Sequence, residues 1–258
     1  MTMLAAFRSH DDPDSLPLRA IPFSRLVRAE WAKATDTRSA RWLLALVAMS
    51  TAGVMLVLLL APTSVDQTHA SYLRVGAIAL SIPLPVVAIL MITSDWSRGS
   101  VLATFTQEPR RLRVVNAKLT VSLILAGGGA VCGGLVTAAA VGLATASGRN
   151  LEADLSAGRI VGYVLWVILN VLAGVALGLL LHNSATAIAA AFALPATAAI
   201  LGTASTVVSN WIDMSTTWDA VLANDWAGRV PQITCSIVFW VGAPLAAGVV
   251  RTTRRDIT

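Results

Sequence analysis

Six long apolar stretches, separated by polar segments, divide this chain of 258 residues. They contain no Asp, Glu, Lys or Arg, and they run over residues 42–61, 75–93, 119–144, 160–181, 185–208 and 233–250. Because the hydrocarbon core of a bilayer is about 30 Å thick, about 20 residues of helix at about 1.5 Å each are enough to cross it. The pattern therefore predicts an all-α membrane protein with six transmembrane helices.

The segment before the first apolar stretch, residues 22–41, has a helical period of its own. Phe23, Val27 and Trp31 recur every fourth residue and share one helix face, while most of the basic residues fall on other faces. This predicts an amphipathic helix in the inner membrane interface, with basic side chains reaching lipid phosphates. An ordinary juxtamembrane helix is the alternative. Residues 1–21, which lack an apolar core, are expected to be a flexible cytoplasmic tail, and residues 22–258 to be one transmembrane domain.

Basic residues are distributed unevenly between the polar segments. Fifteen of the nineteen Lys and Arg residues lie in segments 1–41, 94–118 and 251–258. An excess of Lys and Arg marks the cytoplasmic side of a membrane protein, so both termini are predicted to be cytoplasmic. Since topology accounts for the basic charge, the sequence pI of about 10.0 gives no reason to expect a nucleic-acid partner.

A few residues interrupt the apolar stretches. Proline lacks a backbone donor and kinks or unwinds a helix, which marks either a hinge or cavity or a kink packed against neighbouring helices. The one strongly polar side chain near the middle of a span is expected to make an interhelical hydrogen bond or to contact a substrate. The candidate pathway residues of these two kinds are Pro83, Pro85, Asn170 and Pro195.

Small residues and tryptophans predict two further features. Glycine pairs at four-residue spacing, which let helices approach closely in lipid, occur at 129/133, 158/162 and 174/178. Segment 209–232 contains three tryptophans, Trp211, Trp218 and Trp226. Tryptophan favours membrane interfaces, so this segment is expected to lie at the outer interface as one or two short helices, either re-entrant or as an anchor.

Motifs for catalysis are absent from the sequence. It contains no GxxxxGK[ST] loop for ATP, no HExxH, no paired Cys and His ligands and no GxSxG. We therefore expect no catalytic residues, no metal site and no cofactor in this chain. The apolar stretches also lack the ionisable side chains that proton- or sodium-driven carriers usually keep at membrane depth. If the protein transports a substrate uphill, the energy is expected to come from outside this chain.

Two segments carry a resemblance to a known family. Residues 92–105 read ITSDWSRGSVLATF and are followed by Pro109-Arg110-Arg111 and Ala117-Lys118. This resembles the first cytoplasmic loop of the ABC-2 type permease family, the membrane subunits of ABC exporters, although Asp95 stands where Glu is usual and Ser100 where Thr is usual. Residues 28–33, RAEWAK, resemble the Glu-x-x-Lys interfacial helix that precedes the first span in that family.

The resemblance implies a division of labour between subunits. Two copies of a separate cytoplasmic ABC ATPase subunit would bind ATP and Mg and supply energy. A second permease subunit, in a homodimer or heterodimer, would complete the pathway in a bacterial cytoplasmic membrane. The substrate would be an amphiphile such as a drug, lipid or peptide. The interfacial helix would include Phe23, Val27, Glu30, Trp31 and Lys33.

The same resemblance places coupling to the ATPase in loop 94–118. Val101, Leu102 and Phe105 form an apolar ridge suited to a groove on a partner, or alternatively pack against the chain's own spans while the arginines meet anionic lipid. The candidate coupling residues are Asp95, Arg98, Gly99, Ser100, Val101, Leu102, Phe105, Arg110 and Arg111. Other hypotheses remain open: an ATP-independent membrane carrier, or a membrane scaffold or sensor subunit whose working surface is segment 210–229.

Overall fold

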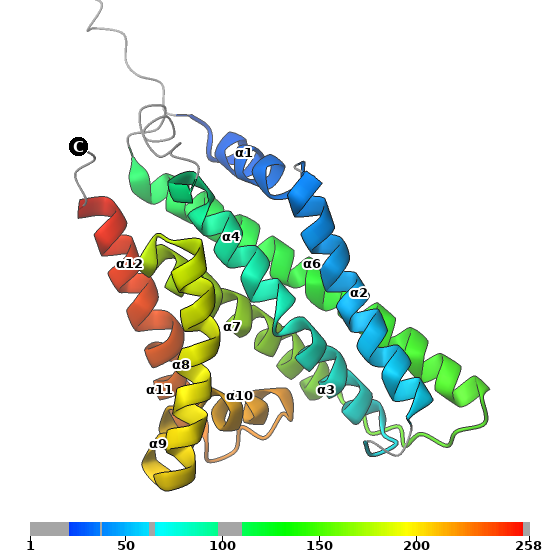
Figure 1. Ribbon diagram of the computed structural model, residues 1–258. Helices are drawn as coiled ribbons and strands as arrows, with labels where there is room; N and C mark the ends of the chain where they lie inside the picture. Colours follow the sequence, from blue (N-terminus) through cyan, green and yellow to red (C-terminus); the bar gives the residue numbers. More distant parts are fainter. Residues whose placement is uncertain (1–20, 37, 62–64, 98–109, 255–258) are drawn as a thin grey trace, which may run out of the picture.

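The computed structural model describes residues 21–36, 38–61, 65–97 and 110–254, and the regular structure over these ranges is helical (Figure 1). Six helical stretches within them are long and apolar enough to cross a membrane. These stretches are Arg41–Leu60, His69–Ser97, Arg111–Ala146, Ala157–Leu181, Ser184–Ala204 and Val230–Arg254. The predicted all-α architecture with six candidate spans is confirmed.

The stretches are built from shorter helices as well as continuous ones. In chain order the elements are α1 (Phe23–Thr35), α2 (Arg38–Leu60), α3 (His69–Leu80), α4 (Pro83–Ser97), α6 (Arg111–Ala146), α7 (Ala157–Leu181), α8 (Ser184–Ala204), α9 (Thr206–Trp211), α10 (Met214–Leu222), α11 (Val230–Ile237), the π-helix η3 (Val238–Gly242) and α12 (Ala243–Arg254).

The second span is interrupted where prolines were predicted to interrupt it. Helix α3 ends at Leu80 and α4 begins at Pro83. Proline has no N–H to continue the helical hydrogen bonding, and it disfavours helical geometry in the residue before it. The two helices therefore meet at a break near the middle of the span.

Several boundaries differ from the predicted ones. The helix predicted over 22–41 ends at Thr35, and Arg38 and Arg41 belong to α2. The third span begins at Arg111, before the apolar stretch at 119, because the charged residues preceding that stretch continue the same helix. The fifth ends at Ala204, because the Ser205 side chain accepts a hydrogen bond from Val208 N–H and starts the new helix α9.

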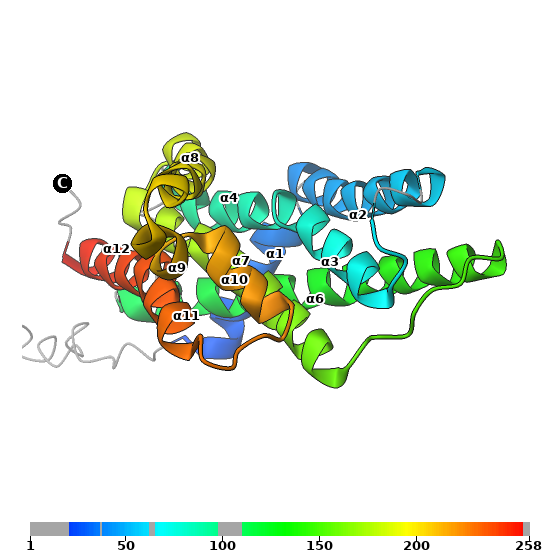
Figure 2. The same cartoon turned by 90° about the horizontal axis from the view of Figure 1, so that it is seen from below.

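Helix α7 lies at the centre of the bundle. It packs against α3, α4, α6, α8, α10 and α12, and both views place it inside the group (Figures 1 and 2). A Cβ added at Gly162 would lie 2.2 Å from the carbonyl oxygen of Val221 in α10, and one at Gly174 would lie 3.0 Å from that of Pro85 in α4. These glycines therefore permit backbone-to-backbone contact, as their spacing predicted.

The segment between the last two spans forms two short helices, α9 and α10, as predicted. Asp213 caps α10 by accepting a hydrogen bond from Ser215 N–H. Trp218, however, is almost fully buried in the protein, at 1% exposure, so this tryptophan packs against other parts of the chain, and the interfacial position of the segment stays a prediction. The indole of Trp240, in η3, donates to the carbonyl oxygen of Ile212 at 2.6 Å and fastens this segment to the last span.

Candidate functional site: a buried charge quartet

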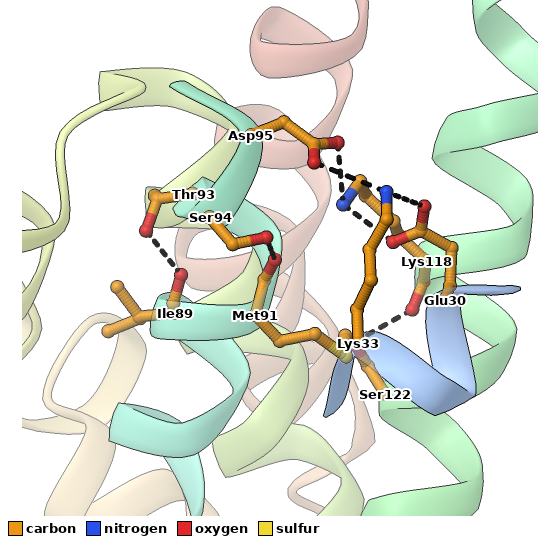
Figure 3. A network of polar contacts seen from close by, with 9 residues as sticks. All are labelled: Glu30, Lys33, Ile89, Met91, Thr93, Ser94, Asp95, Lys118 and Ser122. Atoms are coloured by element: carbon orange, nitrogen blue, oxygen red, sulfur yellow. Dashed lines mark hydrogen bonds and ion pairs between the residues drawn. The ribbon is translucent and has the colours of Figure 1, made fainter. Parts of the chain in front are cut away.

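Four charged side chains meet at one end of the bundle (Figure 3). Glu30 and Lys33 come from α1, Asp95 from the last turns of α4, and Lys118 from the early part of α6. Exposure is only 4% for Glu30, 6% for Asp95 and 2% for Lys118. We call these four residues the quartet. Charged residues are almost never this deeply buried unless they are paired, so their arrangement needs an explanation.

The quartet is a closed ring of alternating charge. Lys118 Nζ lies 2.7 Å from Glu30 Oε2 and 3.0 Å from Asp95 Oδ2. Lys33 Nζ lies 2.7 Å from Glu30 Oε1 and 3.2 Å from Asp95 Oδ1. Each carboxylate thus gives one oxygen to each ammonium group, and the formal charges sum to zero. This pairing offsets the large cost of removing the ions from water.

Lys33 stands at the edge of the quartet, with its side chain about one third exposed. Burial lowers its pKa, but the hydrogen bond and charge of Glu30, together with Asp95, outweigh burial and hold the pKa above the ordinary lysine value. The stabilisation from this ammonium is therefore fully present below the unfolded-state pKa and is lost only as pH rises through the raised folded-state value. Its charge is retained at neutral pH.

A second contact fixes the same end of α4. The Trp96 ring stacks on the His182 ring, with centroids 4.2 Å apart and an interplanar angle of 23°. His182 ends α7 in the left-handed conformation (φ 54°), and its Nε2 lies 2.9 Å from Thr252 Oγ1 of α12. The C-terminal end of α4 is thereby tied to the α7–α8 turn and to α12, in addition to α1 and α6.

Arg111, at the start of α6, reaches α12 as well. Its Nη1 donates to the carbonyl oxygens of Thr252 and Thr253 at 3.2 and 3.4 Å. These carbonyls lie in the last turn of α12, where a cation also complements the helix dipole. Both helices that flank the 98–109 segment are therefore bonded to several others.

The sequence-predicted coupling residues are only partly described. Asp95 lies in the quartet, Arg110 is exposed at the start of α6, and Arg111 contacts α12. The remaining six lie outside the described residues: Arg98, Gly99, Ser100, Val101, Leu102 and Phe105.

The predicted residues of α1 separate into two faces. Phe23 and Trp31 are exposed, at 42% and 40%, whereas Val27 packs against the main core and Glu30 is buried. Lys33 was predicted to reach outward to lipid, but it pairs with Glu30 and Asp95 because α1 turns this side toward α4 and α6.

Lys118 was missing from the predicted site residues. A signal for it was present, because it directly precedes the apolar stretch at 119 while Asp95 closely follows the stretch that ends at 93. Both stretch ends were predicted to face the same side of the membrane, which places opposite charges in one layer.

The predicted pathway residues lie among packed helices. Pro85 and Asn170 are buried, and Pro83 and Pro195 are half-buried. The Asn170 side chain donates to Trp166 O of its own helix at 2.9 Å, so this hydrogen bond is intrahelical, and among the described residues the predicted interhelical bond is not seen.

We also looked for metal-binding groups among the described residues and for similar proteins. Within the described ranges, no group of three His, Cys, Asp or Glu side chains lies in an arrangement that could hold a metal ion. No family model matches the sequence, and no curated protein matches it.

Proposed function

We propose that this chain is the permease subunit of an ATP-driven ABC exporter of the ABC-2 type, with both termini in the cytoplasm of a bacterium. The observation that carries the proposal is the quartet. The quartet joins α1 to both α4 and α6. In the sequence, residues 98–109 connect α4 to α6. Because one buried joint holds both helices that flank this segment, a force applied to the segment by a partner would reach both helices together.

The coupling step follows from the contacts at the inner end. Motion of a partner ATPase against the apolar ridge of Val101, Leu102 and Phe105 would displace the ends of α4 and α6. The quartet would carry that displacement to α1, and the Trp96–His182 stack and the Arg111 bonds would carry it to α7 and α12. Because packed helices transmit strain instead of deforming freely, the displacement would reach the spans as a shift of whole helices.

The remaining parts of the proposal concern the pathway and its surroundings. The pathway would open between this chain and a second permease subunit, beside the α3–α4 break at Pro83 and Pro85 and beside Pro195 within α8, for an amphiphilic substrate. The exposed face of α1, with Phe23 and Trp31, would lie in the inner leaflet interface. Two ATPase subunits would hold the ATP and Mg.

An ATP-independent carrier is the second candidate, and one observation favours it. Proton-driven carriers keep ionisable groups buried, and the quartet contains three such groups at under 9% exposure. Against this reading, every member of the quartet already has two partners of opposite charge. A ring that is fully paired is better suited to hold helices together than to take up and release protons.

The test is affinity purification of the chain from its native membrane in mild detergent, with ATP hydrolysis measured in the eluate. We expect an ATPase to accompany the wild-type chain and to be lost in the Val101→Asp/Phe105→Asp variant. Val230→Asp is the control, since Val230 is an exposed apolar residue at the start of α11, outside the segment assigned to coupling. Folded wild-type protein eluting alone, without ATP hydrolysis, would overturn the proposal and favour the carrier.

A further inference from the structure

Helices α9, α10 and α11 lie at the end of the bundle away from α1 (Figure 1). A cavity is lined by residues of α9, of α10 and of the start of α11. Its volume is about 380 Å³, within the range of about 300–1,000 Å³ that is usual for small-molecule sites. Polar side chains make up most of its lining: Asn210, Thr216, Thr217, Arg229 and Gln232. Ala220 and Ile233 supply the apolar part of its wall.

Two oxygen atoms in this lining can still accept a hydrogen bond. Gln232 Oε1 is buried and has no hydrogen-bond partner among the described residues. The Thr216 hydroxyl donates to Asp213 Oδ2 at 2.9 Å, which leaves its oxygen lone pairs to accept. A buried acceptor without a partner costs about 1–3 kcal/mol, so a donor supplied by a ligand is favoured here.

Donors are present in the same cavity, but they bring no excess charge. The Arg229 guanidinium lies 3.4 Å from Asp225 Oδ2, and both side chains are more than half exposed, so water and Asp225 together screen its charge. Asn210 contributes a neutral amide. An anion would meet the acceptor oxygens of Gln232 and Thr216, and a cation would meet Arg229. The lining therefore favours a neutral group that both donates and accepts hydrogen bonds, which is the chemistry of a hydroxyl.

An aromatic residue stands beside the cavity. Trp226 packs against the small cluster of Ala220, Val221 and Ile233, two of which line the cavity, and its indole Nε1 is buried without a partner among the described residues. Val230, at the start of α11, is 56% exposed. Because Val230–Arg254 is a candidate membrane span, the cavity lies beside the first turn of that span. A membrane interface at this level would bring lipid headgroups to it.

We propose that this cavity binds a neutral polyhydroxyl group, such as a sugar or glycerol unit. The group would donate to Gln232 Oε1 and Thr216 Oγ1 and would accept from Arg229. The same chemistry is supplied by the headgroup of an outer-leaflet lipid or by a free solute. This site does not depend on ATP-driven transport, so its test and the test of the proposed function fail independently.

The experiment uses the full chain in phosphatidylcholine nanodiscs. Methyl glucoside is the free probe, measured by titration calorimetry, and monoglucosyl diacylglycerol is the lipid probe, measured by native mass spectrometry against plain diacylglycerol. Gln232→Leu removes the unpaired acceptor, and Gln67→Leu, at the same end of the molecule but outside this cavity, is its control. Arg229→Ala changes an exposed donor and provides a second variant that leaves the buried packing intact.

We expect Gln232→Leu and Arg229→Ala each to weaken binding about tenfold, while Gln67→Leu binds as the wild type does. Binding of both probes would identify the sugar as sufficient, and binding of the glucolipid alone would identify a lipid headgroup as the source. If neither methyl glucoside nor the glucolipid binds, the proposal is overturned. Equal affinity of the wild type and both cavity variants, or tighter binding of glycerol 3-phosphate than of methyl glucoside, would overturn it as well.

Discussion

Lys118 Nζ lies 3.0 Å from Asp95 Oδ2, although the two residues belong to different spans and the Lys118 side chain is only 2% exposed. Glu30, from α1, completes the environment of this lysine at 2.7 Å. The three helices therefore share one buried positive charge. Its removal would deprive two buried carboxylates of one of the two ammonium groups that they share.

Replacing this lysine should destabilise the protein strongly. We expect Lys118→Met to lower the free energy of unfolding by about 3–5 kcal/mol, because it leaves buried charge uncompensated. Lys33→Met should lower the free energy of unfolding by less. The Lys33 side chain is about one third exposed, so water can reach the carboxylates that lose this partner. Thermal unfolding in detergent measures both, with the exposed Arg254→Gln as the control.

Exchanging the charges of Asp95 and Lys118 distinguishes the contribution of charge pairing from that of side-chain packing. The double variant Asp95→Lys/Lys118→Asp restores a net charge of zero and one contact between opposite charges, at positions 95 and 118, but it places like charges at positions 30/118 and 33/95. It should therefore recover a measurable part, and not all, of the stability that Lys118→Asp alone loses. If the double variant is no more stable than the sum of the two single changes predicts, the ring of charges does not act as a joint.

The Trp96–His182 stack predicts different results for two changes at one position. His182 has positive φ, which Asn tolerates and a β-branched residue does not. We expect His182→Asn to cost about 0.5–1.5 kcal/mol, the value of an aromatic pair, and His182→Val to cost more through added backbone strain. Urea unfolding compares the variants. Equal stability of the two would show that the backbone conformation at this turn is unimportant.

Helix α10 should leave α7 when the glycine between them gains a side chain. A Cβ at Gly162 would sit 2.2 Å from Val221 O, a backbone atom that cannot rotate away. Gly162→Ala should therefore destabilise the protein, and proteolysis should cut faster near α10. Gly127→Ala is the matched control, because nothing lies within 4 Å of its Cβ, and it should be neutral or stabilising by up to about 1 kcal/mol. Similar stability of the two variants would contradict this packing.

Asp154 should make the start of α3, at the end of the molecule away from the quartet, sensitive to acid. Burial raises its pKa, but hydrogen bonds from Ala70 N–H and Arg159, with the charge of Arg159, outweigh burial and lower the pKa below its ordinary value of 3.8. The stabilisation is therefore present above the unfolded-state pKa and is lost as pH falls through the lower folded-state value. Hydrogen exchange of the first turn of α3 should rise in that acid range in wild type and be insensitive to it in Asp154→Asn.

The spans were predictable and the joint between them was not. Long charge-free stretches report membrane-crossing helices directly, and prolines at 83 and 85 report the break between α3 and α4. The pairing of Lys118 with Glu30 depends on how α1 packs onto α6, which no local pattern determines. Lys33 shows the difficulty, because its spacing placed it among outward-facing basic residues while tertiary packing turned it inward.

The same reasoning explains the other discrepancies. The three tryptophans of segment 209–232 look alike in the sequence, yet Trp218 is buried and Trp211 is 38% exposed. Hydrophobicity alone does not distinguish burial in protein from burial in lipid. The Trp96–His182 stack joins residues that are distant in the sequence and share no periodicity, so only the folded arrangement reveals it.

In the proposed mechanism, the quartet carries ATP-driven motion from segment 98–109 into the spans. Distances between spin labels in the purified complex give the sharpest test of this coupling. Labels at exposed positions Arg28, Val131 and Ile200 report α1, α6 and α8, after Cys132→Ser and Cys235→Ser. Between the nucleotide-free and vanadate-trapped states, the 28–131 distance should stay constant while the 131–200 distance changes, and Lys118→Met should broaden the 28–131 distribution. A 28–131 distance that changes in the wild type, or a 131–200 distance that does not, would contradict a joint that moves as one body.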